Sequence, residues 1–264
     1  MLKVPTMRNQ PLPIPTRMRD DEYRRIFNSE ERFWWYEGMR AVTASLLDGR
    51  LKGKPDARLL DVGCGTGYSI VWLREHLHLS QAFGIDTSPQ AAEFWRLRQI
   101  DTASLASTDR LPFGEGEFDL VTCFDVIYQL DGKPAREAVC EMNRVLKPGG
   151  LLFIREPAYE WMRGSHDLAI GTRHRYTLTE LQRMLRDCGF EIVRSSYANT
   201  LLFWAAAAHR MLSRLRGETE SDVRPVPDWI NRSLLKALRL EAVLLRRIAF
   251  PFGLSVMALA QKSS

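Results

Sequence analysis

Three glycines at alternate positions follow a short apolar stretch in the first third of the chain. They are Gly63, Gly65 and Gly67, and an acid, Asp61, stands two residues before the first of them. Glycines there let the backbone turn sharply and approach a ligand, and a following helix adds favourable N–H dipoles. A carboxylate at this position suits a cationic or hydroxyl-bearing ligand better than a pyrophosphate. The alternative is a tight strand-to-helix turn without a ligand, which requires neither three glycines nor an acid.

The glycine spacing differs from that of a dinucleotide-binding loop. Such a loop reads G-x-G-x-x-G, which would put the third glycine at position 68, where this chain has Tyr68. A second acid, Asp86, ends the next apolar stretch about 20 residues later, where an acid is placed to hold ribose hydroxyls. The other interpretation of Asp86 is a cap for the helix that starts near Ser88.

Apolar stretches of strand length alternate with helical stretches over most of the chain. We expect strands at 57–62, 82–85, 103–106, 118–123, 151–155, 191–197 and 253–261. We expect helices at 20–44, 68–79, 89–99, 134–146, 177–188, 201–215 and 229–248. This alternation predicts a parallel, doubly wound α/β sheet. The domain would span 21–264, with a helical cap at 21–50 and a helical lid inserted at 200–250, after a flexible Pro-containing tail at 1–20.

Five ordered motifs resemble those of the class I S-adenosylmethionine-dependent methyltransferases, in particular the type 11 domain group. They are DVGCGTG at 61–67, GIDTSP at 84–89, LPF at 111–113, FDLV at 118–121 and VLKPGG at 145–150. The resemblance covers about 57–154 with specific motifs and the rest more loosely. It implies a Rossmann-like, mostly parallel seven-stranded sheet with helices on both faces, an antiparallel last strand and the helical insertion before it.

The resemblance also implies S-adenosylmethionine as the cofactor, with the glycine loop around its methionine end and Asp86 on its ribose. We expect the cofactor to be bound by Asp61, Gly63, Cys64, Gly65, Gly67, Asp86, Thr87, Ser107, Thr108, Phe124 and Tyr36. Ser107 stands where the family usually has an Asp for the adenine amine. A His that is frequent after the fourth strand is replaced by Gln129, which leaves no evident general base there.

The best catalytic candidates follow the fifth strand. His166 beside Asp167 could act as a general base, or both could brace a loop. Arg173, His174, Arg175 and Tyr176 could bind the acceptor, with the arginines on a phosphate. The aromatic run at 33–36 either packs in the core or covers the sulfonium.

The composition and net charge of the chain limit the classes of acceptor that we expect. The chain is 45% hydrophobic and 26% charged, which is typical of a globular protein. Its net charge of +5 lies entirely in 231–264, and the neutral charge of the remainder disfavours RNA as the acceptor. The Ser165-His166-Asp167 and Arg175-Tyr176 segments resemble those of bacterial family members with lipid-linked or glycan substrates, and this resemblance implies a small-molecule or lipid- or glycan-linked acceptor. We expect O-methylation by in-line transfer; the alternatives are RNA methylation and a non-catalytic scaffold.

Cellular setting and partners follow from the same sequence. Four scattered cysteines, Cys64, Cys123, Cys140 and Cys188, predict reduced thiols and no metal site. No charge-free apolar stretch of 18 residues occurs, so we expect a cytoplasmic protein. The basic C-terminal helix could touch a membrane, although a lid helix is the preferred interpretation. The oligomeric state is left open.

Overall fold

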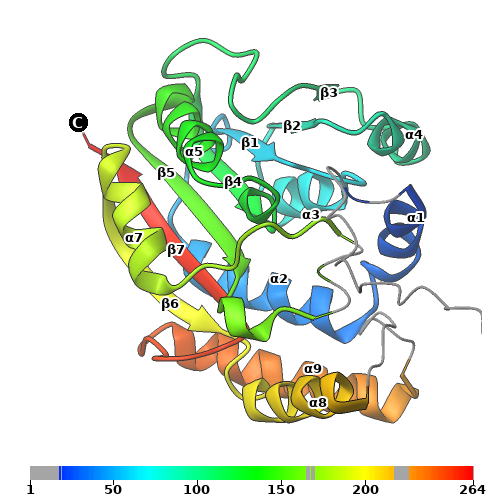
Figure 1. Cartoon of the computed structure of the whole chain (residues 1–264). Helices are drawn as coiled ribbons and strands as arrows, with labels where there is room; N and C mark the ends of the chain where they lie inside the picture. The colour runs from blue at the N-terminus through cyan, green and yellow to red at the C-terminus, as the bar shows by residue number, and fades with distance from the viewer. Residues whose placement is uncertain (1–17, 19, 165–166, 168–169, 217–225, 264) are drawn as a thin grey trace, which may run out of the picture.

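The computed structural model describes residues 18, 20–164, 167, 170–216 and 226–263. Most of the expected tail at 1–20 lies outside the described residues. Within them, a sheet of seven strands is covered by helices on both faces (Figure 1).

The strand order in the sheet is β3-β2-β1-β4-β5-β7-β6. The strands are β1 Arg58–Val62, β2 Gln81–Asp86, β3 Ala103–Leu105, β4 Phe118–Phe124, β5 Leu146–Pro157, β6 Phe190–Ala198 and β7 Ser255–Lys262. Strands β1 to β5 pair in parallel, whereas β7 runs antiparallel to both β5 and β6. The predicted Rossmann-like sheet with its antiparallel last strand is therefore confirmed. The order reverses between β1 and β4, where open α/β sheets bind ligands beyond the carboxyl ends of their strands.

The sheet has a hydrophobic core on each face. Successive residues of a central strand pack alternately into these two cores, because their side chains point to opposite faces of the sheet. The helices are α1 Asp20–Ser29, α2 Trp34–Leu47, α3 Tyr68–His76, α4 Pro89–Leu97, α5 Lys133–Val145, α7 Leu178–Asp187, α8 Phe203–Arg216 and α9 Asp228–Leu245, with short turns η1 Ile127–Gln129 and η2 Glu160–Met162. Leu60 packs in the core formed with α5 and α7, and Leu59 packs in the core formed with α2, α3, α4 and α9.

The region 20–44 forms two helices, so the prediction of one helix is wrong. The chain leaves the helix at 30–33, and there the carboxylate of Glu30 turns inward. It accepts a hydrogen bond from the Thr66 hydroxyl at 2.6 Å and pairs with Arg98 at 2.8 Å. Arg40 holds the same turn by donating to the backbone oxygens of Glu30 and Glu31. These tertiary contacts outweigh the local helical pattern.

Strand β5 begins five residues earlier than predicted. The segment 146–150 continues the strand, with Leu146 paired to Phe118 and a register shift before Leu120. The Pro148-Gly149-Gly150 run therefore lies inside the strand, and Gly149 takes a φ of +74° within it. Thr177 caps α7 in a reciprocal pair of hydrogen bonds with Glu180.

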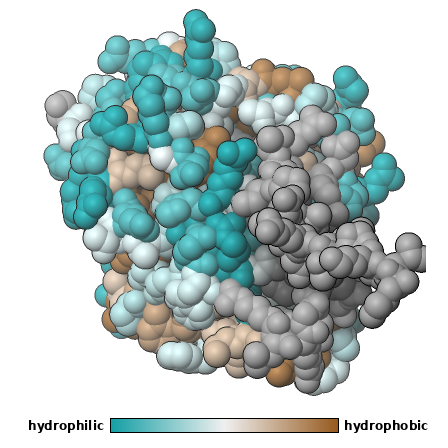
Figure 2. Space-filling model, viewed as in Figure 1, coloured by the Kyte–Doolittle hydropathy of each residue, from teal (hydrophilic) through white to brown (hydrophobic). Residues whose placement is uncertain are grey.

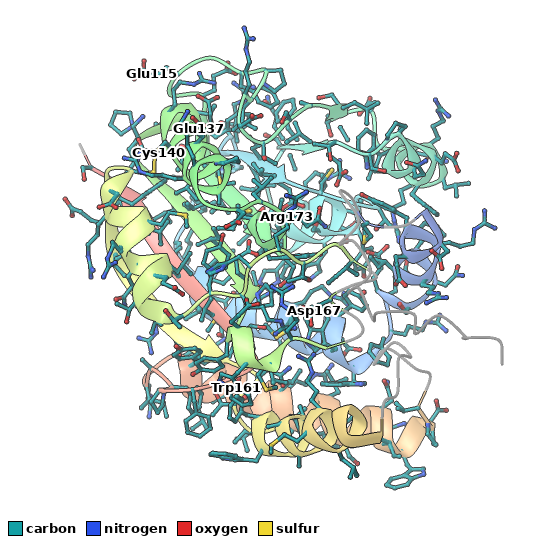
Figure 3. All side chains as sticks on the ribbon, in the orientation of Figure 1. Glu115, Glu137, Cys140, Trp161, Asp167 and Arg173 are labelled. Carbon is teal, nitrogen blue, oxygen red and sulfur yellow. A yellow bond between two sulfur atoms is a disulfide. The ribbon has the colours of Figure 1, made fainter. Side chains whose placement is uncertain are left out.

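Two of the four cysteines are joined. Cys140 of α5 (labelled in Figure 3) forms a disulfide with Cys188, which follows α7 on the same face of the sheet. The prediction of reduced thiols is therefore wrong for this pair, because helix packing brings together two residues 48 positions apart. Cys64 and Cys123 are free and buried.

The helical insertion lies between β6 and β7, as predicted. Helix α9 crosses α2 closely, and a Cβ added to Gly38 would lie 2.3 Å from Leu238 Cδ1, so only glycine fits there. None of the helices in the described part of the chain combines the length and apolar composition that crossing a bilayer requires.

Candidate functional site

A cavity of about 600 Å³ lies at the carboxyl ends of the parallel strands. Strand ends contribute Asp61, Asp86, Phe124 and Pro157 to its wall. Helices α1 and α2 close one side, and residues of α8 and α9 reach the other. The cavity therefore lies at the edge of the sheet where the glycine loop and both predicted acids meet.

The three glycines of the loop all have positive φ, at +76° for Gly63, +53° for Gly65 and +85° for Gly67. A Cβ on Gly63 would lie 2.3 Å from Val126 Cγ2, and one on Gly67 would lie 2.5 Å from Ile100 Cδ1. A Cβ on Gly65 would meet no atom within 4 Å. Packing thus explains two of the glycines, while Gly65 leaves open space at the cavity wall for close approach of a ligand.

Asp61 is buried at the end of β1. One carboxylate oxygen accepts from the Thr122 hydroxyl at 2.6 Å, and the other accepts from the Ser69 hydroxyl. Burial raises the pKa of Asp61 to about 6, although both hydroxyls act against this rise. Asp61 thus gains its negative charge as the pH rises through about 6, and the affinity for a cationic ligand should rise with that charge.

Asp86 ends β2 and joins the loop to the start of α4. Its Oδ2 accepts from the Gly65 N–H at 2.9 Å, and its Oδ1 accepts from the Ser88 N–H at 2.8 Å and the Tyr23 hydroxyl at 3.2 Å. Asp86 therefore braces the backbone just before α4 but does not cap the helix, because Ser88 is the N-cap residue and no side chain caps the first helical N–H groups. A carboxylate offers about four acceptor positions, so one position on Oδ2 remains for a ligand hydroxyl. Burial raises the pKa of Asp86.

The aromatic run of α2 lies on the cavity wall, with Phe33, Trp34, Trp35 and Tyr36 all contributing. The Arg155 guanidinium stacks 5.2 Å from the Trp35 ring centre and 5.0 Å from that of Phe124. It also pairs with Asp125, so its charge is already balanced. Of the two interpretations of the aromatic run, this position favours a cover over the cavity.

Nine of the predicted cofactor residues line the cavity: Tyr36, Asp61, Gly63, Cys64, Gly65, Asp86, Thr87, Thr108 and Phe124. Gly67 and Ser107 are not on its wall. Gly67 precedes α3 and packs on Trp95 and Ile100. Ser107 is exposed and donates its hydroxyl to Asp109.

The predicted catalytic pair is described only in part, because His166 lies outside the described residues. Asp167 is fully buried and forms two hydrogen bonds with Arg175, at 2.8 Å (Nε to Oδ1) and 3.1 Å (Nη2 to Oδ2). Burial acts to raise the pKa of Asp167, but the charge and hydrogen bonds of Arg175, together with the Gly164 N–H and the charge of Arg210, outweigh it and lower the pKa. Arg175 also donates to the Ala158 oxygen at 2.9 Å. The pair lines the cavity and fastens the segment to the end of β5 (Asp167 in Figure 3).

The other three predicted acceptor residues do not reach the cavity wall. Arg173 is exposed (Figure 3), and His174 lies 3.9 Å from Glu180. Tyr176 is buried in the core, where its hydroxyl donates to the Ile127 oxygen at 3.3 Å.

Sequence reasoning missed several residues that shape the cavity, and no local pattern marks them. Buried Glu156 accepts hydrogen bonds from three consecutive backbone N–H groups after β4, at 3.0 to 3.2 Å. Glu241 of α9 likewise holds the backbone after β6. Asn199, in that second turn, has a φ of +61° and lines the cavity, and neither atom of its carboxamide has a hydrogen-bond partner among the residues that the structure describes.

The described part of the chain contains no group of three or more His, Cys, Asp and Glu residues that could hold a metal ion.

Comparisons with known proteins identify this arrangement. A family model described as a methyltransferase domain matches residues 60–154. An uncharacterized methyltransferase of Synechocystis sp. is 30% identical over 53% of this chain and 69% of its own length. Phosphoethanolamine N-methyltransferase 3 of Arabidopsis thaliana is 31% identical over 53% of this chain but only 30% of its own length.

A solved structure supports the fold. A methyltransferase of Haloferax volcanii, in complex with the Trm112 methyltransferase activator, aligns with a TM-score of 0.60 over 93% of this chain and 96% of its own. Its sequence identity is 22%, so the likeness concerns the fold alone.

The residues present fit S-adenosylmethionine. Open Gly65 admits the methionine end, buried Asp61 suits its ammonium, and Asp86 has an acceptor position for a ribose hydroxyl. When bound, the cofactor supplies an electrophilic methyl group on a cationic sulfur. The chain belongs to the class I S-adenosylmethionine-dependent methyltransferases, and S-adenosylmethionine is its cofactor.

Proposed function

We propose that the enzyme methylates a hydroxyl oxygen of a small or lipid- or glycan-linked acceptor. Support comes first from the apolar side chains that α8, α9 and the segments next to them add to the cavity wall. Ala206 of α8, Leu234 of α9 and the nearby Val226 and Leu254 line the cavity. Such a wall suits an acceptor with a hydrocarbon portion better than an RNA backbone, which needs a basic surface.

The observation that carries the choice of a hydroxyl is the carboxamide of Asn199. The residue is 1% exposed, and its unpartnered amide is costly to bury unless a ligand completes its hydrogen bonds. An amide offers donors and an acceptor, and a hydroxyl both donates and accepts, so the two are complementary. A cationic amine would be matched better by a carboxylate, and the nearby Asp125 is already paired with Arg155.

An acceptor hydroxyl has to lose its proton during the transfer. We propose His166 as the base, with Asp167 as a positioning residue that anchors the segment through Arg175. Asp167 and Ile170 border the cavity, which supports a base supplied from this part of the chain. His166→Ala should lower turnover by roughly 10²–10⁴-fold without changing cofactor affinity. Turnover within about twofold of the unsubstituted enzyme would show that no base acts from this position.

Transfer of a radiolabelled methyl group tests the acceptor class. The purified enzyme is offered labelled S-adenosylmethionine with matched hydroxyl, amine and thiol acceptors, each in free and lipid-linked form, and with RNA. We expect label on hydroxyl compounds, and a higher KM for them in Asn199→Gly, which retains the positive φ but removes the amide. Label only on amines, thiols or RNA, or no transfer despite cofactor binding, would contradict the proposal.

A further inference from the structure

Helices α8 and α9 carry an unusual share of the exposed apolar side chains. Nine of the 13 exposed large hydrophobic residues in the described part of the chain lie between 201 and 248. Trp204 and Met211 of α8 are 68% and 61% exposed, and Trp229 and Val243 of α9 are 71% and 61% exposed. In Figure 2 hydrophobic residues appear along the lower edge of the molecule, where Figure 1 shows these helices. Apolar surface gathered in this way marks an interaction site.

Helix α9 is apolar on two opposite sides, and α8 exposes apolar side chains next to its buried ones. Helix α9 buries Leu235, Leu238 and Leu245 against the rest of the protein. A helix advances about 100° per residue, so Leu240 and Val243 project from the side opposite Leu238. Helix α8 buries Phe203 and Ala207, and Trp204 and Met211 are exposed within about 100° of them around the helix. A helix that covers a core normally turns a polar side to water, so these exposed apolar side chains are available to a second partner.

Basic residues are interleaved with this apolar surface. Lys236 and Arg247 are exposed on the outward side of α9 and just beyond its end. The segment 231–264 holds six basic residues and one acid, and that acid, Glu241, is buried. Tryptophans beside lysine and arginine are typical of a helix that lies in the interface of an anionic bilayer.

The inner sides of the same helices face the cavity. Ala206 and Arg210 of α8 and Leu234 of α9 line it, and Trp161 lies at the base of α8 with its ring centre 5.9 Å from that of Phe203 (Figure 3). A surface that docks on these helices is therefore separated from the cavity by one helix layer.

We propose that α8 and α9 dock the enzyme on an anionic lipid surface, through Trp204, Trp229, Met211, Leu240 and Val243 with Lys236 and Arg247 beside them. The docking gives the cavity access to an acceptor with a lipid tail, and in this respect it rests on the proposed function. The occupant is a bilayer, because the face combines tryptophans with cations, and Asp228 is the one exposed acid in the described parts of α8 and α9.

Co-sedimentation with vesicles tests the docking. Vesicles of phosphatidylcholine alone are compared with vesicles that also contain phosphatidylglycerol. The protein should bind the anionic vesicles, and added salt should weaken this binding. The double variant Trp204→Gln/Trp229→Gln should bind at least about tenfold more weakly, because both side chains lose apolar contact with the bilayer. Lys236→Glu/Arg247→Glu should lose the preference for phosphatidylglycerol.

Leu97→Gln is the matched control, because Leu97 on α4 is 67% exposed and outside this surface. It should bind vesicles as the unsubstituted protein does. Absence of vesicle binding, equal binding by the tryptophan variant, or self-association that this variant abolishes would overturn the proposal. Calorimetry with S-adenosylmethionine and turnover of a free hydroxyl acceptor should be unchanged in the tryptophan variant. These two readouts separate failure of docking from failure of the proposed function.

Discussion

The hydroxyl of Thr66 lies 2.6 Å and 2.7 Å from the two carboxylate oxygens of Glu30, a residue 36 positions earlier in the chain. The same carboxylate pairs with Arg98 at 2.8 Å. The turn after α1 is thus fastened directly to the glycine loop. This contact couples the helix that closes the cavity to the loop that receives the cofactor.

Glu30→Ala should destabilise the protein by about 1–3 kcal/mol, because the Thr66 hydroxyl and the Arg98 guanidinium both lose a buried partner. The free energy of unfolding in urea measures the effect. Glu31→Ala is the control, since Glu31 pairs with the same arginine through a side chain that is 52% exposed. It should cost less than about 1 kcal/mol. An equal loss of unfolding free energy in the two variants would show that the buried contact of Glu30 contributes no more than the exposed ion pair of Glu31.

Asp86→Asn should weaken binding of S-adenosylmethionine by about 1.5–3 kcal/mol, because an ionised acceptor for the ribose hydroxyls is replaced by a neutral one. The amide oxygen can accept from only one of the Gly65 and Ser88 N–H groups, which bind different carboxylate oxygens, so thermal unfolding is measured alongside to show that the variant is folded. Calorimetry with the cofactor measures the change. Ser107→Ala, at an exposed residue away from the cavity, should bind normally. If Ser107→Ala bound the cofactor more weakly than Asp86→Asn, the ribose site would have to be assigned near Ser107 instead of Asp86.

Binding of the cofactor should strengthen as the pH rises from 5 to 7. The pKa of Asp61 is raised to about 6, so the carboxyl is neutral at the lower pH and ionised at the higher one, where it attracts the cofactor ammonium. Calorimetry at pH 5, 6 and 7 checks this. Asp61→Asn should flatten the rise, leaving a smaller slope from Glu30 and Asp86, whose pKa values burial also raises. An unchanged slope in the variant would exclude Asp61 as its source.

The same pKa shift affects stability in the opposite direction. The folded protein holds a proton on Asp61 at a pH where the unfolded chain has released it, so stability falls as the pH rises from about 4 to 6. Urea unfolding at these pH values should show a smaller fall for Asp61→Asn. An equal fall in the variant would mean that other carboxyls account for it.

The succession of strands and helices along the chain and the residues around the glycine loop were predictable because their signals are local. An apolar strand, a glycine turn and an acid lie within a few residues of one another around Gly63 and Asp86, and the family resemblance supplied the antiparallel last strand. Nine of the 11 expected cofactor residues line the cavity for this reason.

The remaining features depend on contacts between distant segments. The helix break at Glu30 follows from its contact with Thr66, and the Cys140–Cys188 disulfide follows from the packing of α5 against α7. Arg175 has the charge expected of an anion-binding residue, but its partner is Asp167 of the same segment. Sequence spacing cannot show which of several charges meet once the chain is folded.

Calorimetric titration of S-adenosylmethionine into the unsubstituted protein, Gly65→Val and Gly49→Val tests the central claim most directly. Both glycines have positive φ with no atom within 4 Å of an added Cβ, but only Gly65 borders the cavity. We expect one site per chain, loss of binding in Gly65→Val, normal binding in Gly49→Val and no competition from nicotinamide dinucleotides. Equal binding by Gly65→Val, or competition by a dinucleotide, would contradict the assignment of this cavity to the cofactor.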